Sequence, residues 1–433
     1  MIDHKTPNNL EAARRSPALA ETAAGRSGSK LAPRALGIYA GNPSPPSQPL
    51  AGVDKTTGEI PAPARDLRAS RAERFILKAM AGRLLPQGSR TSKCMRWRVP
   101  NRDMQVVYSP AYQKANFQGL QVCASPWACP VCASKIAERR RVEVAAAIAT
   151  AKASGLTVEL LTLTFPHGLG DDLGTITSAA LKAYSKLFSG KAGCKLRERI
   201  DLQGTIRALE VTHGENGWHP HFHVLMFSGR GVSVTSDQVQ ADIALRWQNV
   251  CVSSGLPRPS LSHGCRVDGG DKAAGYVAKG ATWGLESELT RGQAKIAKGR
   301  KGRSPFALLR DYADGDKQAG ALFSEYARVF EGKRQLVWSN GLKRRFAVSE
   351  VSDDELANAI DDTPTRRLAL LTDDQWRLIY RARLESVVLD LAELAPESLA
   401  GFLASLPGRY PPTRATHGDR VAGATAPPSD QSL

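Results

Sequence analysis

The stretch GWHPHFHVLMF, residues 217–227, places three of the chain's eight histidines two residues apart and then continues as an apolar run. Because side chains alternate between the two faces of a β-strand, His221 and His223 should share one face. Two such imidazoles can chelate a divalent metal ion, or they can lie on a solvated face. Pro220 predicts an irregular start to the strand, so we expect His219 to support the site or to contact DNA.

The segment before these histidines supplies a carboxylate. IRALEVTH, 206–213, is β-branched and apolar and predicts a strand. If GENG at 214–217 is a hairpin loop, Glu210 lies opposite His221, with Cβ atoms roughly 5 Å apart. Two histidines and one carboxylate leave positions open on a metal ion and suit Mg²⁺ or Mn²⁺, and Zn²⁺ as well. A one-residue slip would turn Glu210 away, and a salt-bridged strand carboxylate is therefore the alternative.

Segments on both sides of this hairpin complete an α+β pattern. Strands and helices are predicted, in chain order, at 156–165, 175–188, 206–213, 221–227, 236–250 (with Ser236 as the N-cap) and 262–268. The order β-α-β-β-α-β is the split βαβ, or ferredoxin-like, pattern. It predicts an antiparallel sheet with helices on one face and the histidine strand in a central position.

A tyrosine and a lysine follow the last predicted strand. The segment 271–283 predicts a helix, on which Tyr276 and Lys279 are three residues apart and share a face. A metal site in a basic protein suggests phosphate chemistry, in which a tyrosine can attack phosphorus and become a phosphotyrosine. The lysine would offset charge on a phosphate oxygen. The same pair is also common on an ordinary amphipathic helix surface.

Three segments together resemble the motifs of a known family. LTLTFPHG, GWHPHFHVL and GYVAKG occur in this order and are similar to the motifs of rolling-circle plasmid replication initiators, the Rep proteins of the HUH endonuclease superfamily. The resemblance covers residues 90–347. It implies an HUH antiparallel sheet, a divalent metal on His221 and His223, and Tyr276 as the nucleophile with Lys279 beside it. It also implies that the tyrosine nicks one strand at the origin, stays on the 5′ phosphate and leaves a 3′-OH primer.

The chain departs from the motifs of this family at one position. Some relatives carry a glutamate four residues before the tyrosine that activates water in the terminating cleavage, whereas position 272 here is a lysine.

The resemblance also implies partners. These are origin DNA, as a single-stranded or cruciform nick site with adjacent duplex, and a host helicase and polymerase. An HUH transposase or relaxase would use the same site. A non-catalytic zinc-bearing DNA-binding regulator would not need Tyr276.

Four of the seven cysteines lie in the first third of the chain. Cys129 and Cys132, with Pro130 between them, have the spacing of a structural zinc site, and Cys94 and Cys123 would complete a set of four. The spacing between the pairs is irregular, so buried reduced thiols are the alternative.

The chain is strongly basic. Its net charge is +17 over 433 residues, which favours nucleic acid as a partner. Two basic runs predict contacts to the DNA backbone, with solvated segments as the alternative. The candidate contacts are Arg139, Arg140, Arg141, Lys298, Arg300, Lys301 and Arg303.

Composition predicts how the chain is divided. No apolar run is long enough to span a membrane, and the N-terminus lacks the apolar core of a secretory signal, so we expect a cytoplasmic protein with no membrane partner. The predicted parts are a disordered tail at 1–68, a Cys-rich basic subdomain at 69–150, a nicking and strand-transfer domain at 151–348, a separate helical segment at 349–405 and a disordered tail at 406–433.

Overall fold

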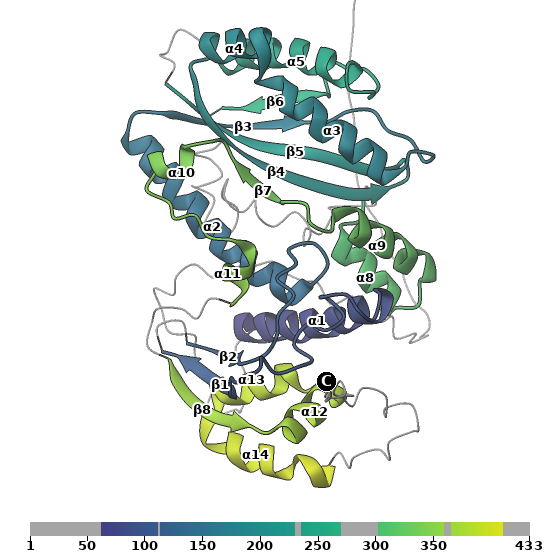
Figure 1. Cartoon of the computed structure of the whole chain (residues 1–433), viewed down its shortest axis with the longest axis vertical. Helices are drawn as coiled ribbons and strands as arrows, with labels where there is room; N and C mark the ends of the chain where they lie inside the picture. Colours follow the sequence, from purple (N-terminus) through teal and green to yellow (C-terminus); the bar gives the residue numbers. More distant parts are fainter. Residues whose placement is uncertain (1–61, 111–112, 230–234, 270–301, 359–364, 410–433) are drawn as a thin grey trace, which may run out of the picture. The chain divides into compact units, whose positions relative to one another are not determined.

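The computed structural model describes residues 62–110, 113–229, 235–269, 302–358 and 365–409 (Figure 1). This part of the chain is a mixed α+β structure with one five-stranded and one three-stranded sheet. None of its helices is both long and apolar enough to cross a membrane.

The five-stranded sheet is antiparallel and has the strand order β6-β3-β5-β4-β7. Its strands are β3 (Thr157–Leu163), β4 (Leu202–Gly214), β5 (Gly217–Ser228), β6 (Cys265–Asp268) and β7 (Leu336–Trp338). The strands β6-β3-β5-β4 stand in the ferredoxin-like order, and the predicted central position of the histidine strand is confirmed. The edge strand β7 was not predicted, because three residues carry too little periodicity to be recognised in a sequence.

One face of this sheet packs against α3 (Leu173–Leu187) and α5 (Ser236–Val252), and α4 (Gly190–Arg199) follows α3 along the chain. The N-cap of α5 is Thr235, which forms a reciprocal capping box with Gln238, so the prediction of Ser236 is wrong. The Ser236 hydroxyl instead donates to the Glu159 carboxylate at 2.5 Å.

The other face of the sheet is covered at one end by α2 (Pro130–Ala153) and the short α10 (Leu342–Arg345). Val144 and Ile148 of α2 share a core cluster with Leu225 and Phe227 of β5. The prediction of helices on one face only is therefore wrong. Towards the start of β5 the residues on this face change from apolar to polar, and the histidines lie at that end.

The helices α1 (Ala62–Leu84), α8 (Pro305–Ala313) and α9 (Lys317–Phe330) join the core on the α3 side. Since α1 begins at Ala62, the predicted disordered tail is wrong over 62–68; residues 1–61 lie outside the described residues. Likewise, the last helix, α14 (Pro396–Arg409), continues four residues into the predicted C-terminal tail, of which 410–433 lie outside the described residues.

The three-stranded sheet joins distant parts of the chain. It contains β1 (Met104–Ser109), β2 (Lys114–Gln118) and β8 (Arg366–Leu371), with β1 in the centre. The helices predicted in 349–405 are present as α11 (Asp353–Asn358), α12 (Asp373–Ala382), α13 (Glu385–Leu394) and α14. They share one core with the cysteine-rich segment, and the Trp376 indole N–H donates to the Met95 carbonyl at 3.1 Å. The prediction that this segment is separate is therefore wrong.

Candidate functional site

The β4–β5 hairpin brings Glu210 opposite His221, in the predicted register. Gly214 pairs with Gly217, so the connecting loop contains only two residues and is shorter than the predicted four-residue loop. The register is nevertheless the same, because both loops are centred between Glu215 and Asn216 and the same residues therefore face one another. Glu210, His221 and His223 therefore point from the same face of the sheet.

The three side chains are close enough to share one metal ion. The Glu210 Oε2 atom lies 3.4 Å from His223 Nε2 and 3.8 Å from His221 Nε2. Two ligands bonded at about 2.1 Å to one metal ion lie roughly 3–3.4 Å apart, so small side-chain movements would complete the coordination. All three groups are largely buried, and a buried carboxylate without a positive charge beside it is costly in free energy. The set of two nitrogens and one oxygen fits a divalent ion with open positions.

Hydrogen bonds on the opposite ring nitrogens prepare both histidines for this role. His221 Nδ1 lies 3.2 Å from the His219 carbonyl oxygen, which can only accept, so this nitrogen carries the hydrogen. His223 Nδ1 lies 3.2 Å from the Thr162 hydroxyl, which can accept a hydrogen in the same way. In these tautomers both Nε2 atoms keep the lone pair that binds a metal ion.

His219 extends the same face of β5. It pairs with Thr212 without a register shift, so the irregular strand start predicted at Pro220 is wrong. His219 Nδ1 lies 2.7 Å from His167 Nε2, and His167 Nδ1 lies 2.9 Å from the Asn216 carbonyl oxygen. Burial and the neighbouring His221 lower the pKa of His219 to about 3, so its ring is neutral. It then donates to His167 and keeps its own Nε2 lone pair.

No role for His167 was predicted from the sequence. It lies in the segment LTLTFPHG, just after β3, so its place in the first motif was the signal available. Five predicted site residues lie outside the described residues. They are the predicted nucleophile Tyr276, Lys279 and the basic residues Lys298, Arg300 and Lys301.

The four candidate DNA-contacting arginines within the described residues all have partners in the protein. Arg303 forms ion pairs with Asp311 at 3.1 Å and Asp316 at 3.4 Å. A phosphate would have to compete with these contacts, and the role of these arginines in DNA binding stays a prediction. Arg139 donates to the Leu356 carbonyl. Arg140 forms ion pairs with Glu143 and Asp353, and Arg141 forms one with Glu138.

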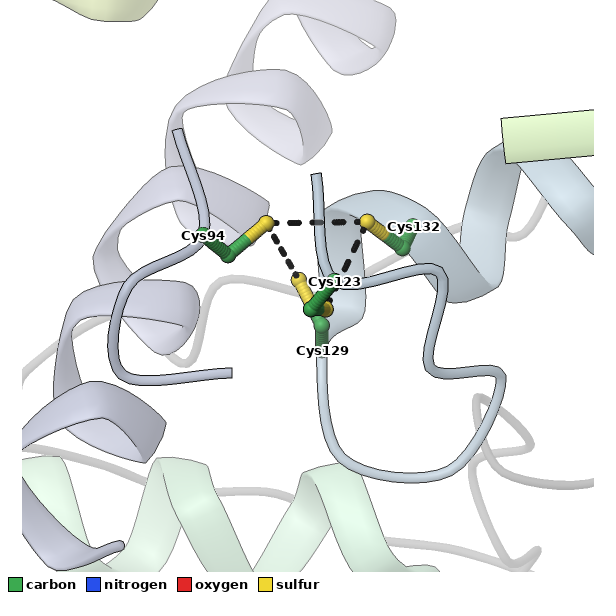
Figure 2. A group of neighbouring side chains, drawn as sticks. All are labelled: Cys94, Cys123, Cys129 and Cys132. Carbon is green, nitrogen blue, oxygen red and sulfur yellow. Dashed lines mark hydrogen bonds between the residues drawn. The ribbon is translucent and has the colours of Figure 1, made fainter. Parts of the chain in front are cut away.

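The four cysteines form a second cluster (Figure 2). Cys94 follows α1, Cys123 and Cys129 precede α2, and Cys132 lies in the first turn of α2. The Sγ atom of Cys94 lies 3.6 Å from that of Cys132 and 3.8 Å from that of Cys129, and Cys123 lies 3.7 Å from Cys132. Sulfurs bound tetrahedrally at about 2.3 Å to Zn²⁺ lie roughly 3.8 Å apart, whereas disulfide sulfurs lie about 2.05 Å apart. The cluster has the dimensions of a zinc site.

The protonation of these thiols also favours a bound cation. Hydrogen bonds from the other three thiols, with Cys123 first, hold the pKa of Cys94 well below its ordinary value. Contacts with Cys123 and Cys94, together with burial, raise the pKa values of Cys129 and Cys132 well above theirs. Four buried thiolates would repel one another, and a divalent ion at the centre would remove this penalty. The four residues therefore fit Zn²⁺ in dimensions and in chemistry.

Comparison with known proteins agrees with the motifs. Residues 114–232, from β2 to just beyond β5, match a family model described as "Replication protein". The chain is 28% identical over 348 residues to "Protein rep" of Streptomyces lividans, which covers 64% of this chain and 76% of that protein. No solved structure matches. The chain is thus similar to Rep replication proteins over these residues, and together with the three motifs these matches support a plasmid replication initiator.

Proposed function

We propose that the protein nicks one strand of the plasmid origin by attack of Tyr276 on a phosphodiester, at a divalent metal ion held by Glu210, His221 and His223. The observation that carries this proposal is the convergence of these three buried side chains on the central hairpin of the sheet. Within the described residues, the other group of metal-ligand type is the cysteine cluster, whose four ligands would leave no open position on Zn²⁺.

In the proposed reaction, the Tyr276 oxygen forms a bond to phosphorus as the bond to the 3′ oxygen breaks. The tyrosine proton passes to solvent, the 3′ oxygen leaves and takes up a proton from solvent to become a 3′-OH, and the 5′ phosphate stays on the tyrosine. A bound Mg²⁺ or Mn²⁺ would polarise the non-bridging phosphate oxygens. Lys279 would offset charge that develops on them, and Thr162 would hold the His223 ring in its metal-binding tautomer.

The partners of this reaction are proposals of the same kind. We expect the protein to bind a single-stranded or cruciform nick site with adjacent duplex, and to pass the primer to a host helicase and polymerase. For the cysteine cluster we propose a structural Zn²⁺ that links the segment after α1 to the start of α2.

A labelled single strand carrying the nick site, incubated with the protein and Mn²⁺, tests the nicking proposal. The wild-type protein should form an adduct that survives a denaturing gel, and Tyr276→Phe should form none while keeping its fold and its DNA affinity. Peptide mapping should place the adduct on Tyr276. An adduct on Tyr312 would disprove this nucleophile. Tyr326 is a poor candidate for attack, because its side chain is fully buried and burial raises its pKa.

A further inference from the structure

A basic and aromatic stretch lies beside the cysteine cluster and has no role in the proposed nicking reaction. Residues 90–102, RTSKCMRWRVPNR, hold five Lys or Arg and no acidic residue. We call residues 93–102 the Trp97 loop. Five of its large side chains are exposed: Lys93, Arg96, Trp97, Arg98 and Arg102. Such a row of cations around an aromatic ring is the composition of a nucleic-acid surface.

The backbone of the Trp97 loop is held in place along its length. Cys94 anchors its start in the cysteine cluster. Further along, the loop runs antiparallel to 119–121: Gln121 donates to the Trp97 carbonyl at 2.9 Å, and Val99 donates to the Gly119 carbonyl at 2.8 Å. The Trp97 loop is therefore organised before a ligand arrives, which lowers the entropy lost on binding.

Trp97 is the unusual residue of this loop. Its side chain is 52% exposed, although burial of a side chain as large as tryptophan normally stabilises a protein. The Arg96 guanidinium carbon lies 4.9 Å from the centre of the Trp97 ring, a cation–π contact. An exposed ring beside a guanidinium can stack on an unpaired base while the cation reaches its phosphate.

Several charges of the loop are available for a ligand. Lys93, Arg96 and Arg102 have no acidic partner within the part of the chain that the structure describes. Arg98 lies 3.8 Å from Asp373, but both side chains are about half exposed, so this ion pair is weak and a phosphate could replace it. At Lys93, Arg96 and Arg102 the loop thus offers positive charge that no acidic side chain among the described residues pairs with.

We propose that the Trp97 loop binds single-stranded DNA, with Trp97 stacked on a base and Lys93, Arg96 and Arg102 on the backbone. Unpaired DNA is favoured over duplex because a paired base has both faces covered by its neighbours, whereas an unpaired base can stack on the indole. The proposal rests on the proposed function only for the source of the strand, which would be the DNA opened at the origin.

Binding can be measured without nicking, in full-length protein carrying Tyr276→Phe and with an oligothymidylate that lacks a nick site. Fluorescence anisotropy should show that Trp97→Ala weakens binding roughly tenfold, the usual effect of losing one stacked base. Trp97→Phe should keep most of the affinity. Arg96→Gln with Arg102→Gln should flatten the salt dependence by about 0.7 per lost phosphate contact.

Lys191→Gln with Lys195→Gln, two exposed residues of α4, gives a control with the same change of charge. It should leave the affinity and the salt slope nearly unchanged. Unchanged affinity in Trp97→Ala, or an equal loss for duplex DNA, would overturn the proposal. Because these measurements use no nicking activity, failure of the Trp97 proposal would leave the Tyr276 adduct unaffected, and failure of the adduct would leave this binding unaffected.

Discussion

The two candidate metal sites of this protein differ in how the chain builds them. The Glu210, His221 and His223 site comes from one hairpin, and its geometry follows from the register of two neighbouring strands. The cysteine cluster instead joins a segment after α1 to the start of α2 and contributes four sulfurs. A site with three protein ligands leaves room for a substrate, whereas four sulfurs close the coordination of Zn²⁺. The first arrangement suits chemistry and the second suits stability.

The largest expected effect is the loss of nicking when the hairpin site is removed. His221→Ala with His223→Ala should abolish nicking of a labelled origin strand, because no metal ion would polarise the phosphate. Most of the duplex affinity should remain, since it comes mainly from phosphate contacts elsewhere. EDTA should have the same effect on the wild-type protein. Nicking that persists in EDTA would refute the metal role of this site.

The cysteine cluster should respond in the opposite way, through stability. Elemental analysis should find about one zinc per chain that survives mild chelation. Cys129→Ser should then lower the thermal unfolding temperature strongly, because the binding energy of a structural zinc contributes to folding. Cys194→Ser is the matched control, since Cys194 is exposed and lies outside the cluster. Zinc-free protein of normal stability would show that the four cysteines are ordinary thiols.

A smaller effect should separate metal binding from the fold. Thr162→Val removes the hydroxyl at 3.2 Å from His223 Nδ1 and preserves the shape of the side chain. The Mn²⁺ concentration needed for half-maximal nicking should rise about 10-fold or more, as expected when a group that orients a ligand is lost. Thr177→Val is the control, because the Thr177 hydroxyl is buried and has no hydrogen-bond partner among the described residues. Equal Mn²⁺ dependence in both variants would argue against the orienting role of Thr162.

The sequence by itself determined the local features of this protein. Apolar alternation and a short glycine-bounded turn were enough to predict that Glu210 pairs with His221. Capping chemistry is local in the same way, since the Thr372 side chain at the start of α12 accepts a hydrogen bond from the Gln375 N–H. Both features depend on residues close together in the chain, where strand periodicity, turn length and capping chemistry act directly.

Only the tertiary structure decided which distant segments meet. Met104 of β1 pairs with Leu371 of β8, and Cys94 lies beside Cys132. In neither pair does the local sequence pattern predict which distant segment will be the partner. The exposure of Trp97 could not be predicted either, because a tryptophan in a basic run has the same local sequence whether its indole is buried or exposed to solvent. Such contacts depend on how whole faces and edges pack together, and the free energy of that packing is not encoded in any single stretch of sequence.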